Sequence, residues 1–100
     1  MRERKFEDAL ITKIKEKFQD VILITNDGYQ SRPDILILFK GGWAVLQIKK
    51  SKNSFPLPSQ KIWMEMLSDI ACFASWVYPE NEKEVLEHLE IALEIWRWKK

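Results

Sequence analysis

The stretch that decides the fold is "RPDILILFKGGWAVLQIKKSK", residues 32–52. Two apolar runs flank a Lys-Gly-Gly segment, and this pattern predicts antiparallel strands at 34–39 and 43–50 joined by a tight turn. Asp34 opens the first strand, while Gln47 and Lys49 lie inside the end of the second. An acid, an amide and an amine therefore interrupt an otherwise apolar hairpin, all at the end away from the turn.

The position of the turn decides which of these polar residues face each other. If residues 41–42 form the turn, Asp34 faces Lys49; if residues 40–41 form it, Asp34 faces Gln47. In either register the three side chains project from one face, with cross-strand neighbours about 5 Å apart. Two interpretations stay open, because unpaired buried polar groups are costly. One is an Asp34–Lys49 ion pair, with Gln47 holding a loop, and the other is a shared site for an ion or a ligand.

The opposite face of the hairpin is wholly apolar, so it must be covered by other parts of the chain. The face that carries the three polar residues is also apolar, except at the end of the hairpin where they lie. We therefore expect helices to cover both faces of the hairpin. The residues of the wholly apolar face are Ile35, Ile37, Phe39, Ala44, Leu46 and Ile48.

Helical and strand patterns in the rest of the chain surround this hairpin with five more elements. We expect helices at 3–19 and 60–73, a final helix from residue 80, and short strands at 21–25 and 75–78. Ser59 is the expected cap of the second helix. That helix lies between the third and fourth strands, which suits a crossover to a parallel neighbour. The prediction is an α/β fold with a mixed central sheet flanked by helices. The expected inward side of the second helix is Ile62, Trp63, Met66, Leu67 and Ile70.

Length and composition indicate one globular domain, residues 1–100, with 46% hydrophobic residues and a formal net charge of +1. This charge does not by itself announce a nucleic-acid partner, although a local basic patch is compatible with it. The single cysteine fits a reducing compartment, and no apolar run is long enough for a membrane span. We therefore expect a cytoplasmic protein with no membrane partner.

Glu7 is the one acid in the middle of the apolar stripe of the first helix. It shares that stripe with Ile11, Ile14 and Phe18, at helical spacing. Taken alone, Glu7 is better explained as a first-turn acid that favours the helix dipole and extends to water. Its position on the inward stripe nevertheless makes it a candidate partner of the polar residues of the hairpin.

The pattern "PD", then twelve residues, then "QIK", on the two strands of one hairpin, resembles the signature of the PD-(D/E)XK nuclease superfamily. Gln47 stands where that signature usually has a second acid. The segment "SKNSFPLPSQKIWMEML" resembles the VRR-NUC branch, which is similar in core to Holliday-junction resolvases. The resemblance covers roughly residues 3–78 and implies a restriction-endonuclease-like αβββαβ core, here with an extra C-terminal helix.

The resemblance also implies a chemistry for the named residues. Asp34 would be the main ligand of Mg²⁺ or Mn²⁺, with Gln47 ligating through its side-chain oxygen, Ile48 through its backbone carbonyl and Glu7 directly or through water. Lys49 would orient the attacking water or stabilise charge on the phosphate. The expected function is a metal-dependent DNA endonuclease that selects DNA structure rather than sequence, in the cytoplasm of a bacterial or phage-infected cell.

Basic residues around the hairpin are the expected contacts with DNA phosphates, and a domain this small is expected to act as a homodimer. Two other classes of function stay open. Because Gln47 carries no charge, the chain also fits a nuclease fold that binds DNA but cuts weakly or not at all. The other class is a protein-interaction domain that uses its final helix. The expected DNA contacts are Arg32, Lys50, Lys52 and Lys61.

Overall fold

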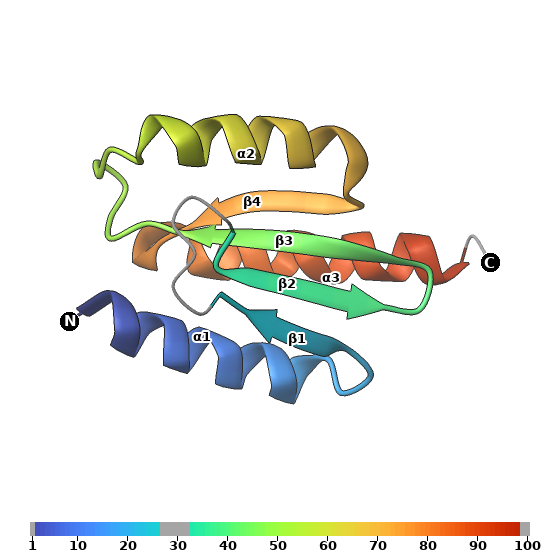
Figure 1. Cartoon of the computed structure of the whole chain (residues 1–100). Coiled ribbons are helices and arrows are strands. Elements are labelled where there is room, and N and C mark those ends of the chain that lie inside the picture. Colours follow the sequence, from blue (N-terminus) through green and yellow to red (C-terminus); the bar gives the residue numbers. More distant parts are fainter. Residues whose placement is uncertain (1, 27–32, 99–100) are drawn as a thin grey trace.

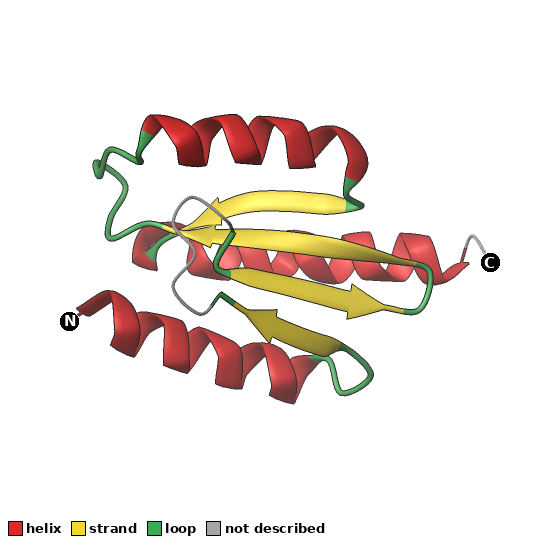
Figure 2. Ribbon diagram, viewed as in Figure 1, coloured by secondary structure: helices red, strands yellow, loops and turns green. Residues whose placement is uncertain are grey.

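The computed structural model describes residues 2–26 and 33–98, and the side chains of residues 5–26 and 33–95. The order of the elements confirms the α/β prediction, an αβββαβ arrangement followed by a C-terminal helix (Figures 1 and 2). A short 3₁₀ turn at Pro79–Asn81 leads into the last helix. The elements are α1 (Arg2–Lys17), β1 (Ile22–Thr25), β2 (Ile35–Phe39), β3 (Gly42–Ile48), α2 (Pro58–Ile70), β4 (Phe73–Val77) and α3 (Glu82–Trp98).

The four strands form one mixed sheet in the order β1-β2-β3-β4. The pairs β1–β2 and β2–β3 are antiparallel, whereas β3 and β4 run parallel. A parallel pair needs a long connection between its strands, and α2 supplies it, as its place in the sequence predicts. Figure 1 shows α2 along the β4 side of the sheet and α1 along the β1 side.

The hairpin adopts the register in which Lys40 and Gly41 form the turn, since Phe39 pairs with Gly42. Gly41 has a φ of 106°, which a residue with a side chain adopts only with strain. A Cβ added to Gly42 would overlap the Sγ atom of Cys72, so the close approach of β3 to the start of β4 also requires a glycine. These two glycines fix the turn and, through it, the pairing along the whole hairpin.

The core lies on the wholly apolar face of the hairpin, where α1 and α3 cover the sheet. The buried residues of α3 recur at helical spacing, and ion pairs join α1 to α3 at Lys13–Glu82 (2.7 Å) and Lys17–Glu90 (3.3 Å). Coverage of this face is therefore confirmed. The side chains of this core are Leu10, Ile14, Phe18, Ile35, Ile37, Phe39, Ala44, Leu46, Ile48, Val77, Val85, Leu89 and Leu93.

The expectation that helices cover the other face is met only in part, because Val45 and Gln47 are buried there but the β1 side of the face is not. On that face Leu36 and Leu38 are only half-buried, and the β1 residues beside them, Ile22 and Ile24, are exposed. The predicted inward side of α2 is also largely wrong, because the one buried residue of this helix is Met64 and only Leu67 of the five predicted residues is half-buried. Helical periodicity identified an apolar stripe on α2, but that stripe faces outward. Its exposed members are Ile62, Trp63, Met66 and Ile70.

The start of α2 also differs from the prediction. The helix begins at Pro58, so Ser59 lies inside its first turn rather than capping it. Proline is favoured at this first position because it has no N–H group to leave unpaired. The backbone N–H of Leu57 donates to Oε1 of Gln60 at 3.0 Å, and this bond fixes the entry to the helix. The helix ends at Ile70, three residues before the predicted end.

Candidate functional site

Asp34 and Gln47 face each other at the open end of the hairpin, in the register that pairs them directly. The amide Nε2 of Gln47 donates to Oδ2 of Asp34 at 2.8 Å. The backbone N–H of Ile48 donates to the same oxygen, also at 2.8 Å. On the other side of Asp34, its carbonyl accepts from the backbone N–H of Asn26 at 3.0 Å. The Asp34 carboxylate is thus bonded to β3, while its backbone carbonyl is bonded to Asn26, the residue after β1.

Gln47 is the one buried polar residue among those described, with 1% of its surface exposed. Its Nε2 is paired with Asp34, but its Oε1 is buried and has no hydrogen-bond partner among the described residues. A buried acceptor without a partner costs about 1–3 kcal/mol. Its neighbours Val45 and Leu46 show that an apolar side chain is accommodated in this strand. Gln47 is therefore hard to explain by folding alone, and Oε1 is an acceptor for a cation or a donor brought by a ligand.

The oxygen atoms at this end of the hairpin fit a hard divalent cation by their chemistry. Mg²⁺ prefers carboxylate, amide and carbonyl oxygens, and Asp34 and Gln47 supply the first two kinds. The N–H and C=O of one residue leave a strand on the same side, so the bond from Ile48 N–H to Asp34 also puts the Ile48 carbonyl on that side. Within the described residues, no three His, Cys, Asp or Glu side chains are grouped to hold a metal. Amide and carbonyl oxygens would have to complete such a site.

Glu7 lies on α1, where it is half-buried, one turn before the fully buried Leu10. The N-terminal half of α1 lies toward the end of the sheet where β2 begins and β3 ends (Figure 1). This is also the end at which Asp34 and Gln47 meet. A role for Glu7 as a metal ligand stays a prediction.

Lys49 does not face Asp34 across the hairpin, because the register that would pair them is not formed. Its Nζ donates to the carbonyl oxygen of Lys52 at 3.3 Å. The same ammonium group lies 5.1 Å from the ring centroid of Tyr78 and 6.0 Å from that of Trp76, within reach of a cation–π interaction. Lys49 is thus directed toward the loop after β3 and toward β4.

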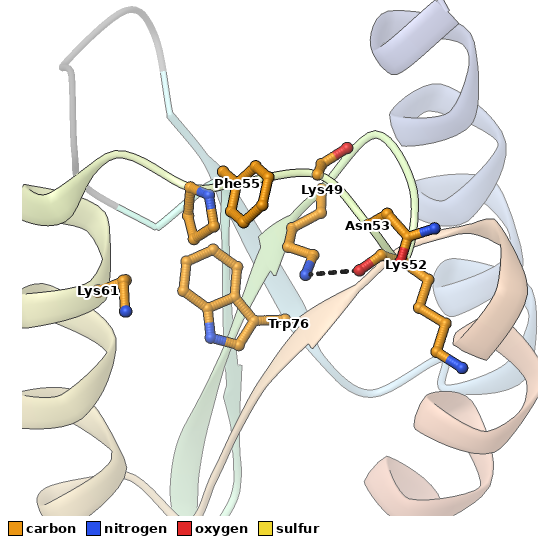
Figure 3. Close-up of a pocket in the computed structure, with 8 residues that line it drawn as sticks. Lys49, Lys52, Asn53, Phe55, Lys61 and Trp76 are labelled. Atoms are coloured by element: carbon orange, nitrogen blue, oxygen red, sulfur yellow. Dashed lines mark hydrogen bonds between the residues drawn. The ribbon is translucent and has the colours of Figure 1, made fainter.

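A pocket of about 650 Å³ opens beside Lys49, between the loop after β3, the start of α2 and β4 (Figure 3). It brings together Lys52 and Lys61, two of the four predicted DNA contacts. Lys50 is exposed but is not part of the pocket lining, and Arg32 lies outside the described residues. The lining residues are Lys49, Lys52, Asn53, Ser54, Phe55, Pro56, Lys61 and Trp76.

Sequence reasoning missed two aromatic members of this pocket, Phe55 and Trp76. Phe55 had a usable signal, because it is the only aromatic residue in a loop otherwise made mostly of polar and proline residues. Such a residue is not needed to form the loop. Trp76 had no comparable signal, since its place opposite Gln47 depends on the parallel pairing of β3 with β4.

No protein-family model matches the chain, and neither a curated protein nor a solved structure matches it. The resemblance to PD-(D/E)XK nucleases therefore rests on the residues of the hairpin and on the order of the elements. Among the residues that the structure describes, no helix has the length and apolar character that crossing a membrane requires.

Proposed function

We propose that this protein is a divalent-metal-dependent DNA endonuclease that selects DNA structure rather than sequence. The observation that carries the proposal is the buried Oε1 of Gln47, an acceptor without a partner among the described residues, on an amide bonded to Asp34. An apolar residue would satisfy the fold at this position. A polar residue kept there against a cost in stability is typical of a functional site.

The proposed roles follow from what each group offers. Asp34, Gln47 and Ile48 would hold Mg²⁺ or Mn²⁺ through oxygen atoms, with Glu7 as a further ligand. When bound, such a metal activates a water molecule and stabilises charge on the phosphate. Lys49 would stabilise the phosphate, because it follows Gln47 by two residues and so lies on the same face of the strand. Its contact with the Lys52 carbonyl, at 3.3 Å, is a weak bond that a phosphate oxygen readily replaces.

DNA is the proposed partner, with Arg32, Lys50, Lys52 and Lys61 as phosphate contacts, and the bacterial or phage-infected cytoplasm is the proposed location. The lining of the pocket supports a polyanion, because it includes three lysines and no acid among the described residues. Contacts of this kind make affinity fall as the salt concentration rises.

The exposed apolar stripe of α2 supports a homodimer. Ile62, Met66 and Ile70 lie four residues apart, and each is more than half exposed. With the exposed part of Trp63, the exposed apolar area of the stripe is about 200 Å², at roughly 100 Å² for a whole side chain. A stable interface buries about 800 Å² on each partner, of which about two thirds is apolar in homodimers. The stripe thus supplies less than half of that apolar part.

Cleavage assays test the enzymatic proposal. Purified protein would be incubated with linear, flapped, four-way and single-stranded DNA, in Mg²⁺, in Mn²⁺ and in EDTA. We expect metal-dependent cleavage of at least one structured DNA, reduced by at least about a hundredfold in Asp34→Asn. This variant keeps an oxygen acceptor but removes the charge. The proposal fails if no DNA is cut in either metal, or if Asp34→Asn cuts as well as the natural chain.

Sedimentation equilibrium tests the homodimer separately. Met66→Glu places a charge in the middle of the α2 stripe and is expected to make the protein monomeric. Ile91→Glu is the matched control, because Ile91 is equally exposed but lies on α3. A natural chain that is already monomeric at tens of micromolar would reject the dimer.

A nuclease fold that binds DNA without cutting is the second candidate. The observation that favours it is the bond from Gln47 Nε2 to Asp34 Oδ2, since this amide already satisfies one of the oxygens that a metal would use. In that case the amide would hold the carboxylate as a structural group. Salt-dependent DNA binding without cleavage in any metal would distinguish this candidate from the enzyme.

A further inference from the structure

Phe55 is the most exposed large apolar residue described, with 97% of its surface accessible. It is held on a fixed loop, because the N–H of Ser54 donates to the Ser51 carbonyl (3.1 Å) and the N–H of Ser51 donates to Oγ of Ser54 (3.0 Å). The following residue, Pro56, further restricts the backbone of Phe55. The chain therefore presents an aromatic ring to solvent on a pre-organised support, which the core does not require.

The surroundings of this ring combine a second aromatic residue with positive charge. Trp76 lies below Phe55 in the pocket, and the ammonium group of Lys49 lies beside Trp76 (Figure 3). Lys61 approaches from α2, whereas the ammonium group of Lys52 points away from Trp76. Aromatic faces with nearby cations are the chemistry that binds an unstacked base together with its phosphate.

The pocket lies in line with the candidate metal site across the sheet. Gln47 pairs with Asp34 on one side and is in register with Trp76 on the other, so the three residues share a row and a face. Neighbouring strands are about 4.8 Å apart, which separates the backbones of Asp34 and Trp76 by roughly 10 Å. A nucleotide in the pocket would thus be close to the candidate metal site at Asp34 and Gln47.

We propose that the pocket binds one unpaired nucleotide, with its base stacked on Phe55 and Trp76 and its phosphate held by Lys49 and Lys61. The nucleotide site itself is independent of cleavage. Its role in choosing the substrate rests on the proposed nuclease function. If both hold, the preferred DNA has an unpaired nucleotide next to the cleaved bond. This preference would explain selection by DNA structure without base-specific contacts.

A nucleotide fits the pocket better than a protein partner. An exposed phenylalanine can also anchor a protein interface, but interface cores are depleted in lysine, and three lysines line this pocket. The volume of about 650 Å³ is within the range of small-ligand pockets, about 300–1,000 Å³. A base and its phosphate use both the aromatic faces and the cations.

Binding in EDTA tests the proposal without cleavage. The probe is a single-stranded oligonucleotide carrying 2-aminopurine, compared with the same sequence as a blunt duplex. We expect tighter binding of the single strand and quenching of the 2-aminopurine. Phe55→Ala should weaken single-strand binding by about tenfold or more, whereas Phe55→Trp should retain it. Leu57→Ala is the matched control, because Leu57 is an exposed apolar residue of the same loop outside the pocket lining.

The dependence of affinity on salt concentration distinguishes the phosphate contact from the stacking of the base. Lys61→Ala should reduce the slope of log affinity against log salt by about 0.7, the value for one phosphate of a single strand. Phe55→Ala should leave that slope unchanged while lowering the affinity. The proposal is overturned if the natural chain does not bind the single strand, or if Phe55→Ala binds it equally well. Phe55-dependent binding without cleavage in any metal would keep the pocket and reject the nuclease.

Discussion

The two ends of the central hairpin differ in the kind of residue that they require. At the turn, Gly41 and Gly42 remove side chains so that the backbone can bend and β3 can approach Cys72. At the open end, Asp34 and Gln47 place polar side chains where the strand is otherwise apolar, and one buried oxygen has no partner among the described residues. The geometry of the fold explains both glycines at the turn. At the open end, folding explains the bond between the amide and the carboxylate, but not the buried Oε1 that lacks a partner among the described residues.

The two ends are also coupled, because the turn sets the register. A slip of one residue would move Gln47 to the opposite face from Asp34. The strict glycine geometry at one end therefore preserves the polar pair at the other. Substitutions at each end test whether the turn end determines the backbone geometry and the open end serves binding.

Asp34→Ala should produce the largest loss of stability at the open end. It leaves the Ile48 N–H and the Gln47 Nε2 without their shared acceptor. At about 1–3 kcal/mol for each unpaired buried donor, we expect a loss of about 4 kcal/mol in the free energy of unfolding, measured by urea denaturation in EDTA. Asp34→Asn keeps an acceptor oxygen and should lose much less. A cost below about 1 kcal/mol for Asp34→Ala would mean that these bonds do not form in solution.

Gln47→Glu should lower stability in EDTA by about 3 kcal/mol, because it replaces the amide that donates to Asp34 with a second carboxylate and so brings two like charges into contact. Mn²⁺ should then raise the melting temperature of this variant more than that of the natural chain, because the added charge strengthens a metal site. Gln60→Glu is the matched control, since an acid is favourable in the first turn of α2 and still accepts the Leu57 N–H.

The outcome for Gln47→Glu separates the two proposed functions. A gain in metal response, with changed cleavage, supports the enzyme. A loss of stability in EDTA without any response to metal favours the fold that binds DNA but does not cut it. No loss in EDTA would contradict the contact between this amide and Asp34.

Gly42→Ala tests the turn end, with an expected loss of about 2 kcal/mol from overpacking against the Cys72 sulfur. Cys72→Ala should restore part of this loss in the double variant, because it removes the atom that the new Cβ would overlap. Thermal denaturation of the two single variants and the double variant measures their coupling. Additive losses would show that the sulfur moves aside without cost.

The fold was largely predictable because its signals are local. Strand alternation and helical periodicity gave the order of the elements, and the Lys-Gly-Gly segment limited the hairpin to two registers that both kept Asp34 and Gln47 on one face. No local pattern decides between the two registers, because Gly41 belongs to the turn in both of them. The outward stripe of α2 was mispredicted because periodicity reports an apolar face without saying what it meets.

The candidate site was likewise predictable only where its residues belong to the hairpin. The pairing of Asp34 with Gln47 was one of the two alternatives derived from the hairpin alone. The orientation of Lys49 toward Trp76 was not predictable, because it depends on β4 pairing in parallel with β3. The pocket likewise combines a loop, a helix and a strand that only the folded chain brings together.

Gln47→Met should have the smallest effect on stability, and it tests directly whether the fold requires Gln47. It removes Oε1, which has no partner among the described residues, as well as the bond to Asp34, and these two changes oppose each other, so we expect a net change below about 1 kcal/mol in EDTA. Val45→Ala, at a buried site of the same strand, should cost about 2 kcal/mol by leaving a cavity. A loss above about 2 kcal/mol for Gln47→Met would mean that Gln47 is kept for stability. A small loss would mean that it is kept for what Oε1 binds.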